Sequence, residues 1–204
     1  MNTALERTER PGSIKRALKL QAAILLGLVA IMWAIEVVDL VVLGGALDAY
    51  GIRPRTVDGL WGILLAPFLH GGLGHVAANT IPFVVLGWLV MLRETWHFFA
   101  VGVIVAVLGG LGVWLTAPAA GVHIGASGVV FGFFGFLLLA GWFERRFGTI
   151  LVSLAVLVAY GGLIFGVLPG QVGISWQSHL FGFLAGVLAA RFLARRPRPA
   201  RAER

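Results

Sequence analysis

The chain has 204 residues, of which 59% are hydrophobic and 12% are charged, and its mean hydropathy is +0.93. This composition excludes an ordinary soluble domain and indicates an integral membrane protein. Because cysteine is absent, a disulfide framework, a thiol nucleophile and a cysteine-based metal site are excluded as well. The formal net charge is +7, but most basic residues flank apolar segments and act as topology signals, so we expect no nucleic-acid partner.

Apolar segments predict an all-α fold with six membrane spans, and all but the fourth are about as long as a hydrocarbon core of roughly 30 Å requires. The predicted spans are residues 18–38, 71–92, 96–116, 127–142, 149–168 and 176–193. Residues 1–17 and 194–204 are predicted to be short polar tails on either side of this single domain. The first span lacks a small-residue cleavage site and is long, so it is predicted to be an anchor rather than a signal peptide.

Residues 40–61 mix apolar residues with glycines, a proline and charges, which is too broken a pattern to span a membrane. We predict an interfacial first loop with a short amphipathic helix there. Glu36 and Asp39 end the first span, where a carboxylate can reach water. We therefore expect these two acids at the interface rather than in a proton pathway.

The basic residues test the six-span topology, because positive charge concentrates on the cytoplasmic side of a membrane. With the N-terminus inside, fourteen of the sixteen basic residues fall inside and only Arg53 and Arg55 fall outside. The fourteen are Arg7, Arg10, Lys15, Arg16, Lys19, Arg93, Arg145, Arg146, Arg191, Arg195, Arg196, Arg198, Arg201 and Arg204. Both termini are therefore predicted to be cytoplasmic.

The fourth span opens with Gly125-Ala126-Ser127-Gly128 at a loop-to-helix junction. Small neighbours let another backbone approach the serine hydroxyl, and a helix N-terminus suits a developing oxyanion. Taken alone, such a run is more often a packing motif of membrane helices. Sixteen helical residues reach only about 24 Å, so Ser127 is predicted to lie below the outer surface in a watered pocket.

Spans two, four and six run from outside to inside, which places His75, Asn79, Ser127 and His179 at one depth. Polar side chains are costly in lipid, so we expect all four to face the bundle interior. The small-xxx-small pairs Gly128/Gly132 and Gly182/Gly186 favour close contact between spans four and six. His179 is then predicted to be a base for Ser127.

A carboxylate to orient that base is missing from the sequence pattern. No Asp or Glu lies between Glu94 and Glu144 or from there to Glu203, and nothing favours Asp48 or Asp58 of the first loop. We therefore predict a Ser–His dyad whose ring is held by packing. Phe131, one helical turn after Ser127, can stack against that ring.

Three motifs together resemble the signatures of the rhomboid intramembrane serine proteases, and the resemblance covers nearly the whole chain. They are His70-x4-His75-x3-Asn79, Gly125-Ala126-Ser127-Gly128 and His179-x2-Gly182-x3-Gly186. The resemblance implies a six-helix bundle with Ser127 as nucleophile and His179 as base. It also implies that His75 and Asn79 bind the oxyanion together with the Ser127 N–H, while His70 is structural.

The same resemblance implies a single-span membrane protein as substrate, cut in or near the outer part of its transmembrane segment, with no cofactor or metal. It implies a bacterial cytoplasmic membrane as the location and the lipid bilayer as the surrounding partner. Trp61 matches the tryptophan of the family's Trp-Arg motif, but Gly62 replaces the arginine. Because an arginine there can anchor the first loop and glycine adds freedom to the unfolded chain, Gly62→Arg is expected to raise thermal stability.

Three other functions compete with the protease. A metal-dependent hydrolase would use His70, His75, His123 and His179, but no His-Glu-x-x-His pair is present, and chelator sensitivity would discriminate it. A catalytically silent rhomboid relative that binds membrane proteins would typically lack Ser127 or His179. A channel or transporter would need polar groups through the full depth, yet the inner half of the spans is almost wholly apolar.

Overall fold

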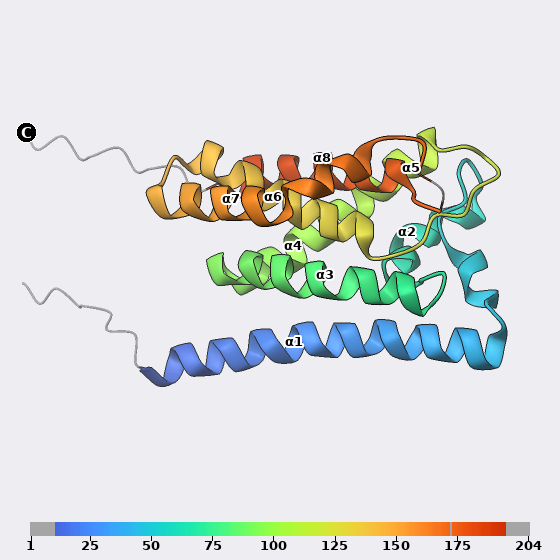
Figure 1. Cartoon of the computed structure of the whole chain (residues 1–204), viewed down its shortest axis with the longest axis horizontal. Helices are drawn as coiled ribbons and strands as arrows, with labels where there is room; N and C mark the ends of the chain where they lie inside the picture. The colour runs from blue at the N-terminus through green and yellow to red at the C-terminus, as the bar shows by residue number, and fades with distance from the viewer. Residues whose placement is uncertain (1–10, 172, 195–204) are drawn as a thin grey trace, which may run out of the picture.

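The structure is a computed structural model that describes residues 11–171 and 173–194. Within these residues the fold is helical, and the only β pairing is one antiparallel bridge between Ile52 and His123. The main helices are α1 (Pro11–Val38), α3 (Leu73–Arg93), α4 (Thr95–Ile104), α5 (Gly110–Thr116), α6 (Ser127–Glu144), α7 (Phe147–Tyr160) and α8 (Trp176–Leu193). They form an elongated bundle, shown in Figure 1. The all-α prediction is confirmed.

Short turns of other helix types lengthen three of these elements. The π-helical turn η1 (Asp39–Leu43) extends α1, and η5 (Val105–Gly109) joins α4 to α5. The 3₁₀ helix η6 (Gly161–Val167) extends α7. α3 contains Pro82 in its interior, as the predicted second span does. Among the described residues, five segments are long and apolar enough to cross a membrane, which defines a multi-pass membrane protein.

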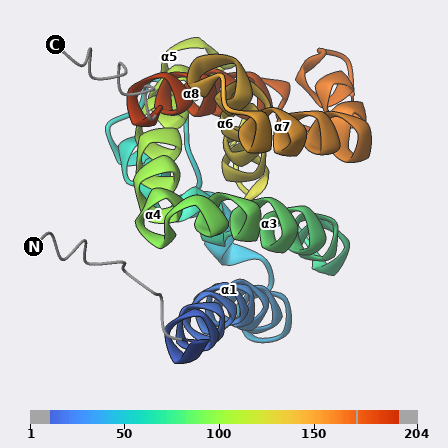
Figure 2. The same ribbon diagram turned by 90° about the vertical axis from the view of Figure 1, so that its left-hand side faces the viewer.

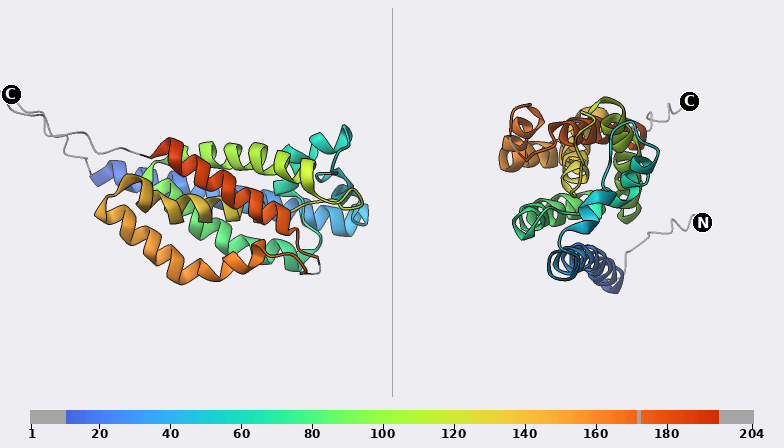
Figure 3. Two further views of the ribbon diagram at one scale, coloured as in Figure 1. Left: turned by 90° about the horizontal axis from the view of Figure 1, so that it is seen from above. Right: turned by 90° about the vertical axis from the view of Figure 1, so that its right-hand side faces the viewer.

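The sixth predicted span corresponds to α8, whose bounds match the sequence prediction. This helix is 18 residues long, as α6 is, but its first turn, Trp-Gln-Ser-His, is polar. Length and composition therefore identify five of the six predicted spans, and α8 stays a predicted sixth. Figure 3 shows α8 running beside the other long helices from one end of the bundle to the other.

The first helix begins at Pro11, seven residues before the predicted span. Proline suits the first position of a helix because its missing N–H would have no intrahelical partner there. Part of the predicted N-terminal tail is thus helical, and residues 1–10 and 195–204 of the two predicted tails lie outside the described residues. Figure 2 shows α1 at the edge of the bundle, where it packs along α3.

The first loop consists of short helical turns. They are η2 (Ala46–Tyr50), η3 (Asp58–Leu60), α2 (Gly62–Leu65) and η4 (Ala66–Phe68). Arg55 ties the loop to the end of α5 by donating to the carbonyls of Leu115 (3.2 Å) and Ala117 (2.8 Å). The Trp114 indole N–H donates to the Thr56 carbonyl at 2.8 Å. These bonds fix the loop against the helix that precedes the serine segment.

The placement of Glu36 and Asp39 corrects the expectation that both acids reach water. Each residue is only 3% exposed. The Asp39 carboxylate accepts a hydrogen bond from the backbone N–H of Leu47 at 2.9 Å. The first loop folds back over the end of α1, so a side chain at the end of a span becomes covered by the chain that follows it.

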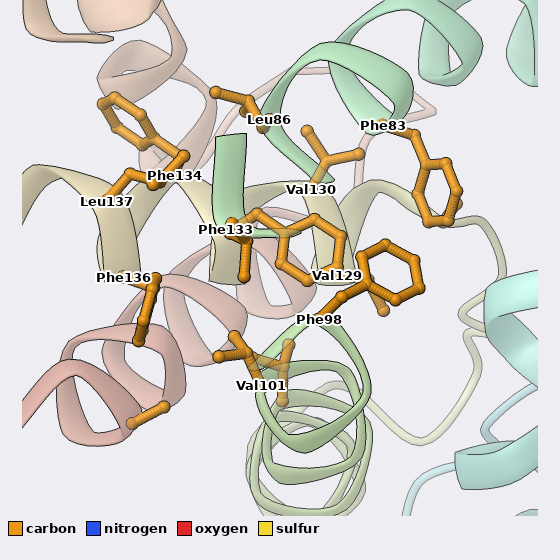
Figure 4. Packing of buried hydrophobic residues seen from close by; sticks show 14 of the residues in the cluster. Phe83, Leu86, Phe98, Val101, Val129, Val130, Phe133, Phe134, Phe136 and Leu137 are labelled. Carbon is orange, nitrogen blue, oxygen red and sulfur yellow. The ribbon is translucent and has the colours of Figure 1, made fainter. Parts of the chain in front are cut away.

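α6 is the central helix of the bundle and packs against α3, α4, α7 and α8. Of the residues of α6, 67% are buried inside the protein, compared with 11% in the most apolar part of the segment formed by α7 and η6. Phe133, Phe134 and Phe136 from α6 are at most 1% exposed, and Figure 4 shows them among side chains of neighbouring helices. Ser127, the first residue of this helix, therefore belongs to the most buried of the five segments that can cross a membrane.

The C-terminal end of α6 is held by charge. Glu144 forms an ion pair with Arg93 at the end of α3, and it accepts a hydrogen bond from the Thr149 hydroxyl of α7 at 2.9 Å. The Arg93 guanidinium also lies 5.2 Å from the centre of the Phe136 ring. Because the three helices are joined at this end, the position of α6 along the bundle axis is fixed.

The environment of Gly62 overturns the expectation that an arginine there is stabilising. The residue is helical and its φ is not positive, so backbone strain is not the obstacle. A Cβ at position 62 would instead overlap the backbone of Gly51 and Ile52. The first loop packs backbone to backbone at this point, which leaves no room for any side chain.

Gly62→Arg and Gly62→Ala are therefore both expected to lower the melting temperature in detergent, at a cost of about 1–3 kcal/mol from overpacking. Gly74→Ala is the matched control, because a Cβ at that position meets nothing within 4 Å. Thermal unfolding followed by circular dichroism measures the effect. A Gly62→Ala protein as stable as the Gly74→Ala protein would contradict the close packing of this loop.

Candidate active site

A cavity of about 700 Å³ lies at the end of the bundle where α3, α6 and α8 begin. Figure 1 shows the first turns of these three helices at the same end of the molecule. The cavity lining includes His75, Asn79, Ser127 and His179. The four side chains that sequence reasoning placed at one depth thus come from three separate helices and meet in one space.

Ser127 is the first residue of α6, and the loop before it is tightly held. The Gly125 N–H donates to the Ala66 carbonyl at 2.8 Å, and the Ala126 N–H donates to His70 Nε2 at 3.3 Å. Gly125 has a φ of +111°, a backbone angle that residues other than glycine rarely adopt. The nucleophile candidate is therefore placed by its own helix and by two hydrogen bonds from the preceding loop.

The imidazole of His179 is oriented on two sides. Its Nδ1 lies 2.9 Å from the Gly166 carbonyl oxygen, so Nδ1 carries the proton and donates it there. The ring is parallel to that of Phe131, with 4.0 Å between centres and 6° between planes. Nε2 is left unprotonated, which is the form that a general base needs.

The Gly166 carbonyl is a part of the site that sequence reasoning missed. It lies in η6, and a Cβ at this residue would come within 2.7 Å of the Phe131 ring and 3.2 Å of His179 Nδ1. Only glycine lets the backbone approach the histidine this closely. A backbone carbonyl thus occupies the place that a carboxylate has in a Ser-His-Asp triad.

His75 and Asn79 lie one helical turn apart on α3. His75 Nδ1 accepts a hydrogen bond from the Gly71 N–H at 3.3 Å, so the proton of the neutral ring is on Nε2. Both His75 Nε2 and Asn79 Nδ2 are directed at Gly125, at 2.6 Å and 3.6 Å from the position that a Cβ would take. The buried Asn79 Nδ2 has no hydrogen-bond partner in the described part of the chain.

These two side chains therefore supply N–H donors beside the start of α6, where the first backbone N–H groups also lack intrahelical partners. A Cβ at Gly125 would block their approach. This is a second reason, besides the positive φ, why the position requires glycine. The arrangement suits the stabilisation of a negative oxygen next to Ser127.

His70 is only 2% exposed, and its Nε2 accepts from the Ala126 N–H. Burial lowers the pKa of His70 to about 4, with a smaller contribution from the nearby His75 ring. The His70 imidazole is therefore neutral at pH 7, as an acceptor of this hydrogen bond must be. The side chain supports the serine loop and is absent from the residues that line the cavity.

The glycines of α6 and α8 bring the two helices into backbone contact, and this pair makes the most extensive helix–helix contact in the described chain. A Cβ at Gly182 would overlap the Gly128 carbonyl, and one at Gly186 would overlap the Gly132 carbonyl. On the other helix, a Cβ at Gly128 would reach the Ser178 carbonyl at 3.4 Å. These glycines thus set the spacing of the two helices that carry Ser127 and His179.

Of the described residues that line the cavity, none is acidic. Asp48 lies nearby without lining it, since its carboxylate would be 3.8 Å from a Cβ at Gly71. Within residues 11–171 and 173–194, no group of three or more His, Cys, Asp or Glu side chains has the spacing to hold a metal ion. The exposed side chain of Trp61 lies outside the cavity.

Fold and cavity together define a helical multi-pass membrane protein with a histidine- and serine-lined site at one end of its bundle. Residues 57–196 match the family model of the rhomboid domain. An uncharacterized protein of Mycobacterium tuberculosis is 45% identical over 186 residues, covering 87% of this chain and 77% of its own length. A Bacillus subtilis protein named as a candidate rhomboid protease is 30% identical over 142 residues, covering 68% of this chain and 70% of its own.

RHOMBOID-like protein 1 of Arabidopsis thaliana is 28% identical over 160 residues, which cover 75% of this chain and 39% of that protein. The chain belongs to the rhomboid family. Membership supports a protease-type function on membrane proteins, although the family also includes inactive members.

Proposed function

We propose that this protein is an intramembrane serine endopeptidase that uses a dyad of Ser127 and His179. The observation that carries the proposal is the common cavity, in which a helix-initial serine meets a histidine whose Nδ1 proton is held by Gly166. A silent relative that only binds membrane proteins has no need of an oriented basic nitrogen.

In the proposed reaction, His179 Nε2 takes the proton of the Ser127 hydroxyl as the serine oxygen attacks the scissile carbonyl carbon. The oxyanion that forms is stabilised by the Nε2–H of His75, the Asn79 amide and the Ser127 N–H. His179 then passes its proton to the leaving amine, and water hydrolyses the resulting ester by the same route.

The proposed substrate class, a single-span membrane protein, comes from the family resemblance, and the position of the cavity at one end of a helical bundle supports it. A single-span helix must unwind before it can be cut, because its own hydrogen bonds shield each peptide group. Small or helix-breaking residues near the cut lower this cost. We place the cut in the outer part of the substrate span, and both termini of this protein on the cytoplasmic side of a bacterial inner membrane.

Two measurements on the purified full chain test this function. A fluorophosphonate probe is expected to attach to Ser127, located by mass spectrometry, because it reacts with an activated serine hydroxyl. In liposomes, the protein is expected to cut a single-span model peptide at a bond near one end of the span. A protein that neither reacts with the probe nor cuts any such peptide would be a silent relative instead.

His75→Ala and Asn79→Ala are each expected to lower kcat roughly 10- to 1,000-fold, the usual cost of losing one oxyanion donor, with a smaller effect on KM. The Ser127 N–H and the other donor remain in either variant. His97→Ala is the matched control, since His97 is also a buried histidine but lies at the start of α4, beside Phe136. An unchanged kcat in both site variants would remove these residues from the reaction.

A further inference from the structure

His123 lies in the segment between α5 and α6, four residues before Ser127, and its backbone is fixed by the first loop. Its N–H donates to the Ile52 carbonyl and its carbonyl accepts from the Ile52 N–H, both at 3.0 Å. The residue is 8% exposed. The mechanism described above does not use this buried histidine.

One nitrogen of the His123 ring is bound to the start of α8. Nδ1 lies 2.6 Å from the Ser175 hydroxyl oxygen. Ser175 caps α8, because its hydroxyl oxygen accepts from the Ser178 N–H at 3.2 Å, and it lies 2.7 Å from the Ser178 hydroxyl. The ring is therefore held in one orientation by the helix that also carries His179.

The other nitrogen of the ring is unused. His123 Nε2 is buried and has no hydrogen-bond partner within the part of the chain that the structure describes. It lies 3.2 Å from the position that a Cβ would take on Gly121, and both residues line the same cavity as Ser127 and His179. An unpaired buried polar nitrogen is costly, so a ligand that pairs with it is favoured over one that cannot.

We propose that His123 Nε2 is a substrate-recognition group, which binds a hydroxyl or carboxamide side chain of the substrate within a few residues of the cut. The inference rests on the proposed protease function, since the ligand of this nitrogen is the segment being cleaved. It adds a polar subsite beside the apolar lining residues Pro118, Val122, Ile124 and Ile174.

The class of side chain follows from the hydrogen bonds of the ring. If Ser178 donates to Ser175 and Ser175 donates to Nδ1, then Nε2 carries a proton and is a donor. If these hydrogen bonds have the opposite direction, so that Nδ1 donates to Ser175, Nε2 is an acceptor. A hydroxyl or a carboxamide can donate and accept, so it satisfies Nε2 in both arrangements.

A charged substrate side chain fits this subsite poorly. Burial lowers the pKa of His123, which keeps the ring neutral at pH 7 and removes any ion pair with a carboxylate. The neighbouring lining residues Pro118, Val122, Ile124 and Ile174 offer no charged partner either. A neutral polar side chain is thus the ligand that loses least on leaving water.

The test is a cross of enzyme and substrate variants in liposomes. The probe is a single-span model peptide whose cut bond is mapped first, and in which each of the four residues on either side is replaced in turn by Ser, Asn or Ala. At one position the wild-type protein is expected to prefer Ser or Asn over Ala by about 10- to 100-fold in kcat/KM, as for a buried hydrogen bond.

In His123→Phe this preference is expected to disappear. The preference is the ratio of kcat/KM between peptides on the same enzyme, so it does not depend on any overall change in rate. Gly121→Ala is the second variant, because its methyl group would lie 3.2 Å from Nε2 and shield it without removing the imidazole. Ser and Ala also differ in how readily a substrate helix unwinds. The measured quantity is therefore the coupling, which is the change in the Ser-to-Ala ratio of kcat/KM between wild type and the enzyme variant. Unwinding alone gives no coupling.

The fluorophosphonate reaction at Ser127 distinguishes a failure of the recognition role of His123 from a failure of the protease function. If wild type reacts and cuts, but its preference is absent or is the same in His123→Phe, the recognition role is overturned and the protease stands. If His123→Phe and Ser175→Ala slow every peptide equally, the histidine is only a structural link between loop and helix. If wild type neither reacts nor cuts, both proposals fall.

Discussion

Ser127→Ala and His179→Ala are each expected to reduce cleavage of a single-span peptide by roughly 10⁴- to 10⁶-fold, which brings it to the background rate. The serine variant lacks the attacking oxygen, and the histidine variant lacks the ring whose Nδ1 proton is held by the Gly166 carbonyl and whose Nε2 is free to act as the base. Because the two residues act as one unit, the double variant should be no slower than either single variant.

Cleavage in liposomes, followed by gel and mass spectrometry, measures this effect, and thermal unfolding in detergent shows whether each variant is folded. Ser153→Ala is the matched control, because Ser153 is a buried helix serine whose hydroxyl is bonded to the Leu137 carbonyl in another part of the bundle. It is expected to lose some stability and to keep its activity. Residual cutting by Ser127→Ala at the wild-type bond would show that another group is the nucleophile.

Gly186→Ala is expected to have the largest effect among changes outside the catalytic residues. A single methyl group at this position would overlap the Gly132 carbonyl, and a backbone group cannot turn aside as a side chain can. The helices α6 and α8 must therefore separate, at a cost of about 1–3 kcal/mol. Since Ser127 and His179 are on these two helices, activity should fall together with the melting temperature.

Gly102→Ala tests whether the site of the change matters. Gly102 is also in a membrane helix, α4, but a Cβ there meets nothing within 4 Å. That variant is expected to be as stable as wild type or slightly more stable, because alanine favours a helix by up to about 1 kcal/mol relative to glycine. Equal melting temperatures for the Gly186 and Gly102 variants would show that the two helices tolerate a wider spacing.

The sequence predicted well those features that depend on the direction of helices. The pattern of apolar segments was enough to place the starts of α3, α6 and α8 at the same end, and the meeting of His75, Asn79, Ser127 and His179 follows from that arrangement. The stacking of Phe131 on His179 was also anticipated, because residues one turn apart share a helix face. Periodicity and spacing carry this kind of information.

Contacts made by backbone atoms were not predictable in the same way. The Gly166 carbonyl orients His179, and the backbone of Gly51 excludes a side chain at Gly62, yet neither has a side-chain pattern that signals it. The burial of Glu36 and Asp39 was missed for a related reason. A position near the end of a span predicts exposure to water only when the following loop does not fold over that end.

The carbonyl that orients His179 belongs to η6, which continues α7, and this segment is the least buried of the membrane spans. The proton on Nδ1 thus depends on η6, the exposed continuation of α7. If η6 moves away from α8, the ring loses its acceptor, and its proton can shift to Nε2, where it disables the base. Under the proposed mechanism, the base would then be available only while η6 lies against α8, so that admitting a substrate past this helix and cutting it would be separate events in time.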